Sequence, residues 1–171
     1  MKSKALVEAL NEQINYEYFA SYQYLAMAAY FESAGLSGFA SWMRAQSEEE
    51  LFHAMKIFDF MHDRNARVKL LAIKEPVAEF SSTLDVFEKT LAHEQAVTAS
   101  INALYELSLQ EKDYPTQVML QWFIEEQVEE EKTVQEIIDQ LKLIGDDGTG
   151  LFQLDREMGA RRGATPENGN A

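Results

Sequence analysis

The chain has 171 residues, of which 46% are hydrophobic, and a formal net charge of −14. This length fits one domain with a sizeable core, and the hydrophobic content excludes a disordered acidic tail. The negative charge argues against partners such as nucleic acid or an anionic membrane surface, and the lack of cysteine excludes thiolate metal sites and disulfides. Because we find neither a signal-peptide core nor a membrane-length apolar run, we expect a soluble, cytoplasmic protein.

The first two predicted helices cover about residues 4–34 and 37–64. The segment AGLSG (34–38) between them is typical of a tight turn, so these helices should be antiparallel neighbours. The following segment, ARVKLLAIKEPVAEFSS (66–82), loses the helical period and contains Pro76. It therefore predicts a long connection.

The next two predicted helices cover about residues 83–111 and 114–143. Ser82, with Asp85 three residues later, gives the third helix a start that resembles a capping box. The segment DYP (113–115) places an aspartate and a proline where the N-terminus of the fourth helix favours them.

The end of the chain predicts a stop and a short fifth helix. IGDDGTG (144–150) should end the fourth helix, LFQLDREM (151–158) should form the fifth, and residues 161–171 should be a disordered tail. The expected fold is therefore one all-α domain over residues 1–160. It is a four-helix bundle with one long crossover between the second and third helices and a short fifth C-terminal helix.

Each long helix carries a buried seam that is apolar at its ends and polar near its middle. Tracing the seams in steps of three and four residues places one glutamate in each: Glu17, Glu50, Glu94 and Glu130. A lone buried carboxylate costs several kcal/mol or stays protonated, and four of them would repel one another. The pattern therefore favours cations in the core, with two divalent ions balancing the four charges.

The spacing within two helices supports this interpretation. Glu50 and His53 are three residues apart and converge on one point, and Gln127 and Glu130 share that spacing. Ferritin-like di-iron bundles use a glutamate from each of two helices and Glu-x-x-His from each of the other two. This chain matches that pattern on three helices, and its carboxylate-rich set with one imidazole suits iron or manganese better than zinc.

Other polar and aromatic residues receive structural interpretations. We expect His62 and His93 to be surface or packing residues, and Trp122 to pack beside the apolar face. Tyr24 lies on the same face as Glu17, and a buried tyrosine needs a partner for its hydroxyl. It can hydrogen-bond a ligand carboxylate, and a redox role stays open.

Four segments together resemble a prokaryotic non-haem ferritin: LNEQINYEYFASYQYLAMAAYF (10–31), EEELFHAMKIFDF (48–60), HEQAVTASIN (93–102) and DYPTQVMLQWFIEEQVEEEK (113–132). The similarity extends from about residue 4 to residue 160. The resemblance implies a homo-oligomeric, hollow cage of twenty-four subunits. It also implies that each bundle oxidises Fe(II) with dioxygen or hydrogen peroxide at a ferroxidase centre, and that ferric mineral collects inside the cage.

The resemblance also implies roles for individual residues. One iron site would use Glu17, Glu50 and His53, and the other would use Glu50 as a bridge with Glu94 and Glu130. Gln127 would lie close to the second site, and Tyr24 matches the tyrosine beside the centre. An acidic trio matches a third iron site found in some family members: Glu49, Glu126 and Glu129.

Two departures separate the chain from haem-bearing bacterioferritins. Gln127-x-x-Glu130 replaces their second Glu-x-x-His, and Leu51 stands where they carry the haem-ligand methionine, so we expect no haem. Two other functions stay open. One is a di-iron oxidase or peroxidase with permanently bound metals, and the other is a helical module whose acidic face binds a basic partner.

Overall fold

The computed structural model describes residue 1 and residues 3–161. The helices are α1 (Lys4–Ser33), α2 (Ser37–Asp63), α3 (Thr83–Gln110), α4 (Tyr114–Ile144) and α5 (Gly148–Ala160), and no strand occurs in the described part of the chain. The expected all-α architecture is confirmed. The predicted tail at 161–171 lies outside the described residues except for Arg161.

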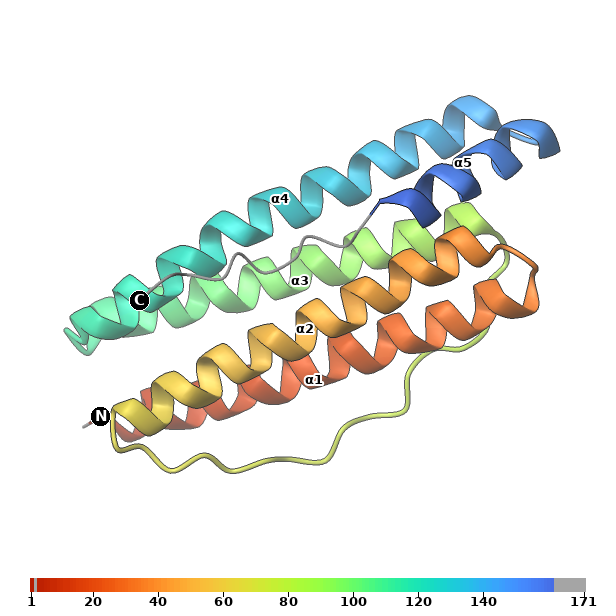
Figure 1. Cartoon of the computed structure of the whole chain (residues 1–171). Coiled ribbons are helices and arrows are strands. Elements are labelled where there is room, and N and C mark those ends of the chain that lie inside the picture. The colour runs from red at the N-terminus through yellow and green to blue at the C-terminus, as the bar shows by residue number, and fades with distance from the viewer. Residues whose placement is uncertain (2, 162–171) are drawn as a thin grey trace.

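The four long helices form two antiparallel pairs. Helix α1 packs along α2, α3 packs along α4, and α1 also contacts α3 (Figure 1). Helices α1 and α4 run in one direction while α2 and α3 run in the other, because the crossover returns along the full length of the bundle (Figure 1). This is the predicted bundle with a single long crossover.

Side-chain caps fix the helix starts where the sequence placed them. The Ser82 side chain accepts a hydrogen bond from the Asp85 amide at 3.1 Å, and Asp113 accepts one from the Thr116 amide at 3.2 Å. Each cap satisfies an amide that has no partner within its own helix. The predicted bounds of the long helices agree with the structure to within one residue.

The fifth helix is longer than predicted, since it covers Gly148–Ala160 where 151–158 was expected, whereas α4 ends at Ile144, where the stop was predicted. Helix α5 starts at Gly148 because Asp147 accepts hydrogen bonds from the amides of Thr149 and Gly150 at 3.0 and 3.2 Å. This cap outweighs the low helix propensity of two glycines. The helix packs against α2 at Gly38, where a Cβ would lie 1.6 Å from the Asp155 carbonyl oxygen, so this contact requires glycine.

The crossover is held against α1 by side-chain amides. Gln23 accepts a hydrogen bond from the Val77 amide at 2.9 Å and donates one to its carbonyl at 2.8 Å. Asn11 accepts one from the Lys69 amide at 2.6 Å. These bonds replace the regular backbone pairing that an extended segment lacks.

The core divides into two apolar clusters at opposite ends of the bundle. One contains Phe31, Phe39 and Phe87 with α5, and the other contains Leu10, Ile57, Ile101 and Leu120 among others. The polar seam residues lie between them. No helix in the described part of the chain is long and apolar enough to cross a membrane.

Candidate metal centre

The four seam glutamates reach the middle of the bundle from four different helices. Glu17 comes from α1, Glu50 from α2, Glu94 from α3 and Glu130 from α4. Their exposed fractions lie between 0 and 7%, so the structure buries all four, as the seams predict. A core with this many carboxylates is costly unless protons or cations neutralise it.

Glu17, Glu50 and His53 form the tightest group in this core. One ligand atom from each lies within 4.8 Å of the others, and His53 Nδ1 is 3.3 Å from Glu50 Oε2. Three buried atoms here have no hydrogen-bond partner: Glu17 Oε2, Glu50 Oε2 and His53 Nε2. Unpaired buried acceptors are rare in proteins, so their convergence indicates a place for a cation.

Glu94 is held from two sides. The Tyr24 hydroxyl donates a hydrogen bond to Glu94 Oε1 at 2.6 Å, and Gln127 Nε2 donates one to Glu94 Oε2 at 3.2 Å. The predicted partner of Tyr24 is therefore confirmed as a seam carboxylate. Because Gln127 turns its amide nitrogen toward Glu94, it orients this carboxylate in the present arrangement.

The pKa values of the core carboxyls reflect their crowding. Burial raises the pKa of Glu17 well above its usual range, and the nearby Glu50 raises it further. Burial and the nearby Glu94 raise the pKa of Glu50 well above its usual range. The pKa of Glu130 is also raised well above its usual range, by burial and by the neighbouring Glu94, Glu49 and Glu50. Without cations the core therefore retains protons, and a divalent cation would displace them.

Two glutamines with structural roles at the centre received no role from the sequence. Gln13 Nε2 donates a hydrogen bond to Glu17 Oε1 at 2.8 Å. Gln46 Nε2 donates to Glu49 Oε2 at 3.3 Å and to Glu130 Oε2 at 3.2 Å, and thus connects α2 with α4. The four-residue spacing of Gln13 and Glu17 was a usable signal, since such side chains meet on a helix.

The acidic trio expected to form a third site is only partly brought together. Glu49 is buried and Glu126 is half-buried, and one ligand atom from each lies within 4.8 Å of a ring nitrogen of His53. Glu129 is exposed and does not belong to this group. Its predicted role as a ligand stays a prediction.

Aromatic rings surround His53 and fix the plane of its imidazole. The ring centroids of Trp122 and Phe123 lie 5.4 and 5.8 Å from that of His53, both in edge-to-face contact. The packing role predicted for Trp122 is confirmed. His62 is exposed, and His93 packs edge-on against Tyr16 and Phe19, as expected for surface and packing residues.

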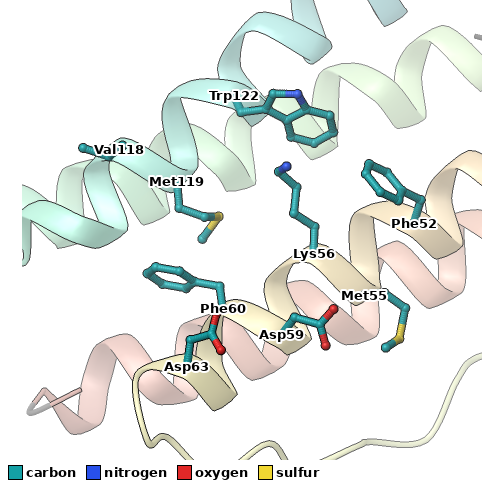
Figure 2. Close-up of a pocket in the computed structure, with 9 residues that line it drawn as sticks. All are labelled: Phe52, Met55, Lys56, Asp59, Phe60, Asp63, Val118, Met119 and Trp122. Atoms are coloured by element: carbon teal, nitrogen blue, oxygen red, sulfur yellow. The ribbon is translucent and has the colours of Figure 1, made fainter. Parts of the chain in front are cut away.

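A groove of about 490 Å³ lies between α2 and α4 next to Trp122. Figure 2 shows Lys56 pointing into it from α2, and its Nζ lies 4.2 Å from the centroid of the Trp122 ring. Trp122 thus lines the groove and also packs against His53. None of the four seam glutamates lines this groove.

The donor set defines what the centre can hold. Carboxylate oxygens with one imidazole are ligands for divalent iron or manganese, whereas structural zinc sites use more nitrogen and sulfur. The sequence matches the family described as the ferritin-like domain over residues 7–144. The chain belongs to the ferritin family.

Other ferritins align with this chain along nearly its whole length. It is 45% identical to a bacterial non-heme ferritin of Staphylococcus aureus (strain USA300) over 161 residues, covering 94% of this chain and 97% of the relative. It is 46% identical to the bacterial non-heme ferritin of Staphylococcus haemolyticus with the same coverage. An open-pore ferritin from the archaeon Archaeoglobus fulgidus superposes with a TM-score of 0.93 at 50% identity, covering 94% of this chain and 99% of that one.

Proposed function

We propose that this ferritin stores iron and detoxifies it by oxidising Fe(II) to Fe(III) at a di-iron ferroxidase centre within each subunit. The observation that carries the proposal is the burial of four carboxylates in the middle of the bundle, two of which, Glu17 and Glu50, converge on His53. Glu17 Oε2, Glu50 Oε2 and His53 Nε2 there have no hydrogen-bond partner. The names of the non-heme ferritin relatives support iron as the cargo.

The proposal gives each ligand a position. Glu17, Glu50 and His53 would hold one Fe(II), and Glu50, Glu94 and Glu130 the other, with Glu50 as the bridge. Fe(II) binding would release the protons that the core carboxyls retain. Gln127 and Tyr24 would keep Glu94 in place while the metal ions enter, since their hydrogen bonds hold both of its oxygens.

The ligand chemistry favours oxidation. Carboxylates are hard anionic ligands that stabilise Fe(III) more than Fe(II), so iron gives up an electron more readily here. Two Fe(II) ions on a shared carboxylate can supply two electrons to one O₂, which takes up two protons and leaves as H₂O₂. Hydrogen peroxide can accept two electrons in the same way and leave as water. The reaction therefore releases no one-electron oxygen radical.

The subunits would assemble into a hollow homo-oligomeric cage of twenty-four, the number that the resemblance to prokaryotic non-haem ferritins implies. This cage would hold the ferric mineral in the cytoplasm. An apolar surface on α1 and the crossover supports association with a second copy of the chain. Its members are exposed although they are hydrophobic: Tyr22, Leu25, Leu70, Leu71, Ile73 and Val77. Exposed apolar patches of this kind mark interaction surfaces.

Haem should be absent from this ferritin. Leu51 is exposed on α2 at the position where bacterioferritins place a methionine ligand, and a leucine side chain cannot ligate haem iron. A stoichiometric Soret band in protein purified from haem-replete cells would contradict this.

Substitution of the core carboxylates tests the proposal. Glu50→Ala, Glu94→Ala and Glu130→Ala should each abolish rapid Fe(II) oxidation in stopped-flow absorbance, while the apo-protein stays folded by circular dichroism. Glu125→Ala is the matched control, because Glu125 is an exposed glutamate on the same helix as Glu130. Wild-type rates in all three core variants would contradict the proposed centre.

Aerobic addition of Fe(II) separates this function from the two alternatives. Storage predicts many irons per chain retained in solution, and a fixed-metal oxidase or peroxidase predicts about two. If the chain were an acidic interaction module, the added iron would precipitate as ferric hydroxide and the protein would not retain it. Electron microscopy of the iron-loaded sample would test the cage and the mineral together.

A further inference from the structure

We infer that Gln13 and Ser100 are positioning residues for the iron centre, because together they hold Glu17 Oε1 and leave Glu17 Oε2 as the oxygen presented to a cation. The inference rests on the proposed di-iron centre. It gives a role in cation binding to two side chains that would not touch the iron themselves. We call the chain of hydrogen bonds from Ser100 through Gln13 to Glu17 the clamp.

The clamp consists of two short hydrogen bonds that run from α3 to α1. The Ser100 hydroxyl donates to Gln13 Oε1 at 2.5 Å, and Gln13 Nε2 donates to Glu17 Oε1 at 2.8 Å. Ser100 is half-buried, whereas Gln13 is 1% and Glu17 0% exposed. Water therefore does not compete for the second bond, and a hydrogen bond to a charged group in such a place is strong.

Ser100 determines which end of the Gln13 amide faces the carboxylate. A glutamine amide has one acceptor oxygen and one donor nitrogen, and exchanging their positions hardly changes its shape. Because the Ser100 hydroxyl donates to Gln13 Oε1, the nitrogen is directed toward Glu17. The reverse orientation would place the amide oxygen against an ionised carboxylate oxygen, so Ser100 and Glu17 favour the same orientation.

The clamp makes the two oxygens of Glu17 unequal. Oε1 accepts the hydrogen bond from Gln13, whereas Oε2 is buried and has no hydrogen-bond partner. Hydrogen bonds to a ligating carboxylate fix its direction and tune its affinity for metal ions. With Oε1 held, Glu17 should bind a cation through Oε2 alone, as a monodentate ligand.

Glu94 on α3 lacks this asymmetry. Both of its oxygens accept hydrogen bonds, from the Tyr24 hydroxyl at 2.6 Å and from Gln127 Nε2 at 3.2 Å. A cation at Glu94 therefore has to share an oxygen with a protein donor, while a cation at Glu17 finds one oxygen free. This difference connects the clamp with cation binding at Glu17.

The competing interpretation is that the clamp only ties α1 to α3. The two interpretations predict different results when the clamp is removed. A tie between helices changes the free energy of unfolding and leaves cation binding as it is. A positioning role changes the affinity for the cation and the number of oxygens that Glu17 gives to it.

Titration of the whole apo-protein with Co²⁺ tests the inference, since Co²⁺ takes carboxylate and imidazole ligands and its visible absorption depends on the coordination number. Gln13→Leu should weaken binding of one Co²⁺ per chain by about tenfold or more and change its absorption bands, because Glu17 is then free to turn or to chelate with both oxygens. Ser100→Ala should act in the same direction, and Ser100→Thr should restore wild-type binding because it keeps the hydroxyl.

Gln135→Leu is the matched control. Gln135 lies on the exposed side of α4, and its Nε2 donates to Asp139 Oδ1 at 2.8 Å, so it repeats the four-residue spacing and the distance of Gln13 and Glu17 away from the core. Its affinity for Co²⁺ and its absorption bands should equal those of wild type. Equal weakening in Gln135→Leu and Gln13→Leu would overturn the inference.

Wild-type affinity and wild-type bands in Gln13→Leu would also overturn the inference, whatever the change in stability. If Gln13→Leu does not fold by circular dichroism, the Ser100 variants decide. Weaker binding in Ser100→Ala with recovery in Ser100→Thr supports the inference, and equal binding in both and in wild type contradicts it. Absence of Co²⁺ binding to wild type would refute the proposed centre itself, whereas unchanged binding in the clamp variants would refute only the positioning role.

Discussion

The ends and the middle of the bundle follow opposite rules. At one end Phe31, Phe39 and Phe87 pack without exposure, and at the middle Glu17, Glu50 and Glu94 are buried just as deeply. Burial of the aromatic rings stabilises the fold, while burial of the carboxylates opposes it. The apolar ends therefore hold the helices together strongly enough for the middle to keep buried carboxylates that oppose folding.

The largest effect is expected from a substitution at an apolar end. Phe87→Ala should lower the free energy of unfolding by about 3–5 kcal/mol, because it leaves a cavity in a closed aromatic cluster. The Phe87 ring centroid lies 5.6 Å from that of Phe39 and 5.5 Å from that of Trp42. Chemical denaturation of the apo-protein measures the change. Leu143→Ala is the control, because Leu143 is 89% exposed and should change little.

Cation binding should offset the unfavourable free energy of burying the carboxylates in the middle of the bundle. At neutral pH, a divalent cation at about one hundred times its dissociation constant should stabilise the wild type by about 2.7 kcal/mol. Glu50→Gln should gain much less, because Glu50 belongs to the core group and would bridge both ions. Thermal unfolding with and without Zn²⁺ measures both proteins. An equal gain in the two proteins would mean that the cation binds elsewhere.

Without cations, a carboxylate in the middle should reduce stability as the pH rises. The folded-state pKa of Glu50 lies well above the ordinary value of 4.5, so its protonated form is stabilised by folding. This contribution is complete below about pH 4.5 and is lost as the pH rises through the folded-state pKa. The apo Glu50→Gln variant should therefore match the stability of wild type near pH 4 and be more stable than wild type at higher pH. Glu125→Gln should show no such crossover.

An ion pair at the bundle end should depend on pH in the opposite direction. The Arg64 guanidinium donates two hydrogen bonds of 2.9 Å to Asp113 and lowers the pKa of that carboxyl to about 2. Its contribution is present above the ordinary value of 3.8 and is lost as the pH falls toward 2. In unfolding curves measured at a series of pH values, Asp113→Asn should therefore lose less free energy of unfolding than wild type as the pH falls toward 2. If the free energy of unfolding falls equally in the variant and in wild type at low pH, this ion pair makes no measurable contribution to stability.

The smallest effect concerns Tyr24. Tyr24→Phe should lower apo stability by about 1 kcal/mol, because Glu94 Oε1 loses its hydrogen bond from the phenol. Tyr22→Phe is the control, since Tyr22 is 49% exposed on the same helix. Stopped-flow oxidation of Fe(II) by the same variants separates two roles. If Tyr24 only positions Glu94, Tyr24→Phe should oxidise the same number of Fe(II) ions per chain in the first round as wild type. If Tyr24 itself is oxidised, the variant should form different oxidation products.

The sequence was sufficient for the elements and the polar layer. The caps at Ser82 and Asp113 and the turn at Gly35 act locally, so residue type and spacing predicted the helix ends. The helical period placed one glutamate per seam because each helix sets the direction of its own side chains. Helix α5 starts earlier than predicted, because the cap at Asp147 outweighs the low helix propensity of the two glycines after it.

Only the tertiary structure decided which side chains meet between helices. The period of a helix fixes directions around its own axis and leaves open its rotation and distance relative to its neighbours. For that reason only the packed bundle shows that Glu126 lies beside Glu49 and His53 and that Glu129 is exposed. The role of Glu129 as a ligand, which the resemblance implies, stays a prediction. The same holds for the Gln46 amide, whose hydrogen bonds to Glu49 on α2 and to Glu130 on α4 could not be predicted from the period of one helix.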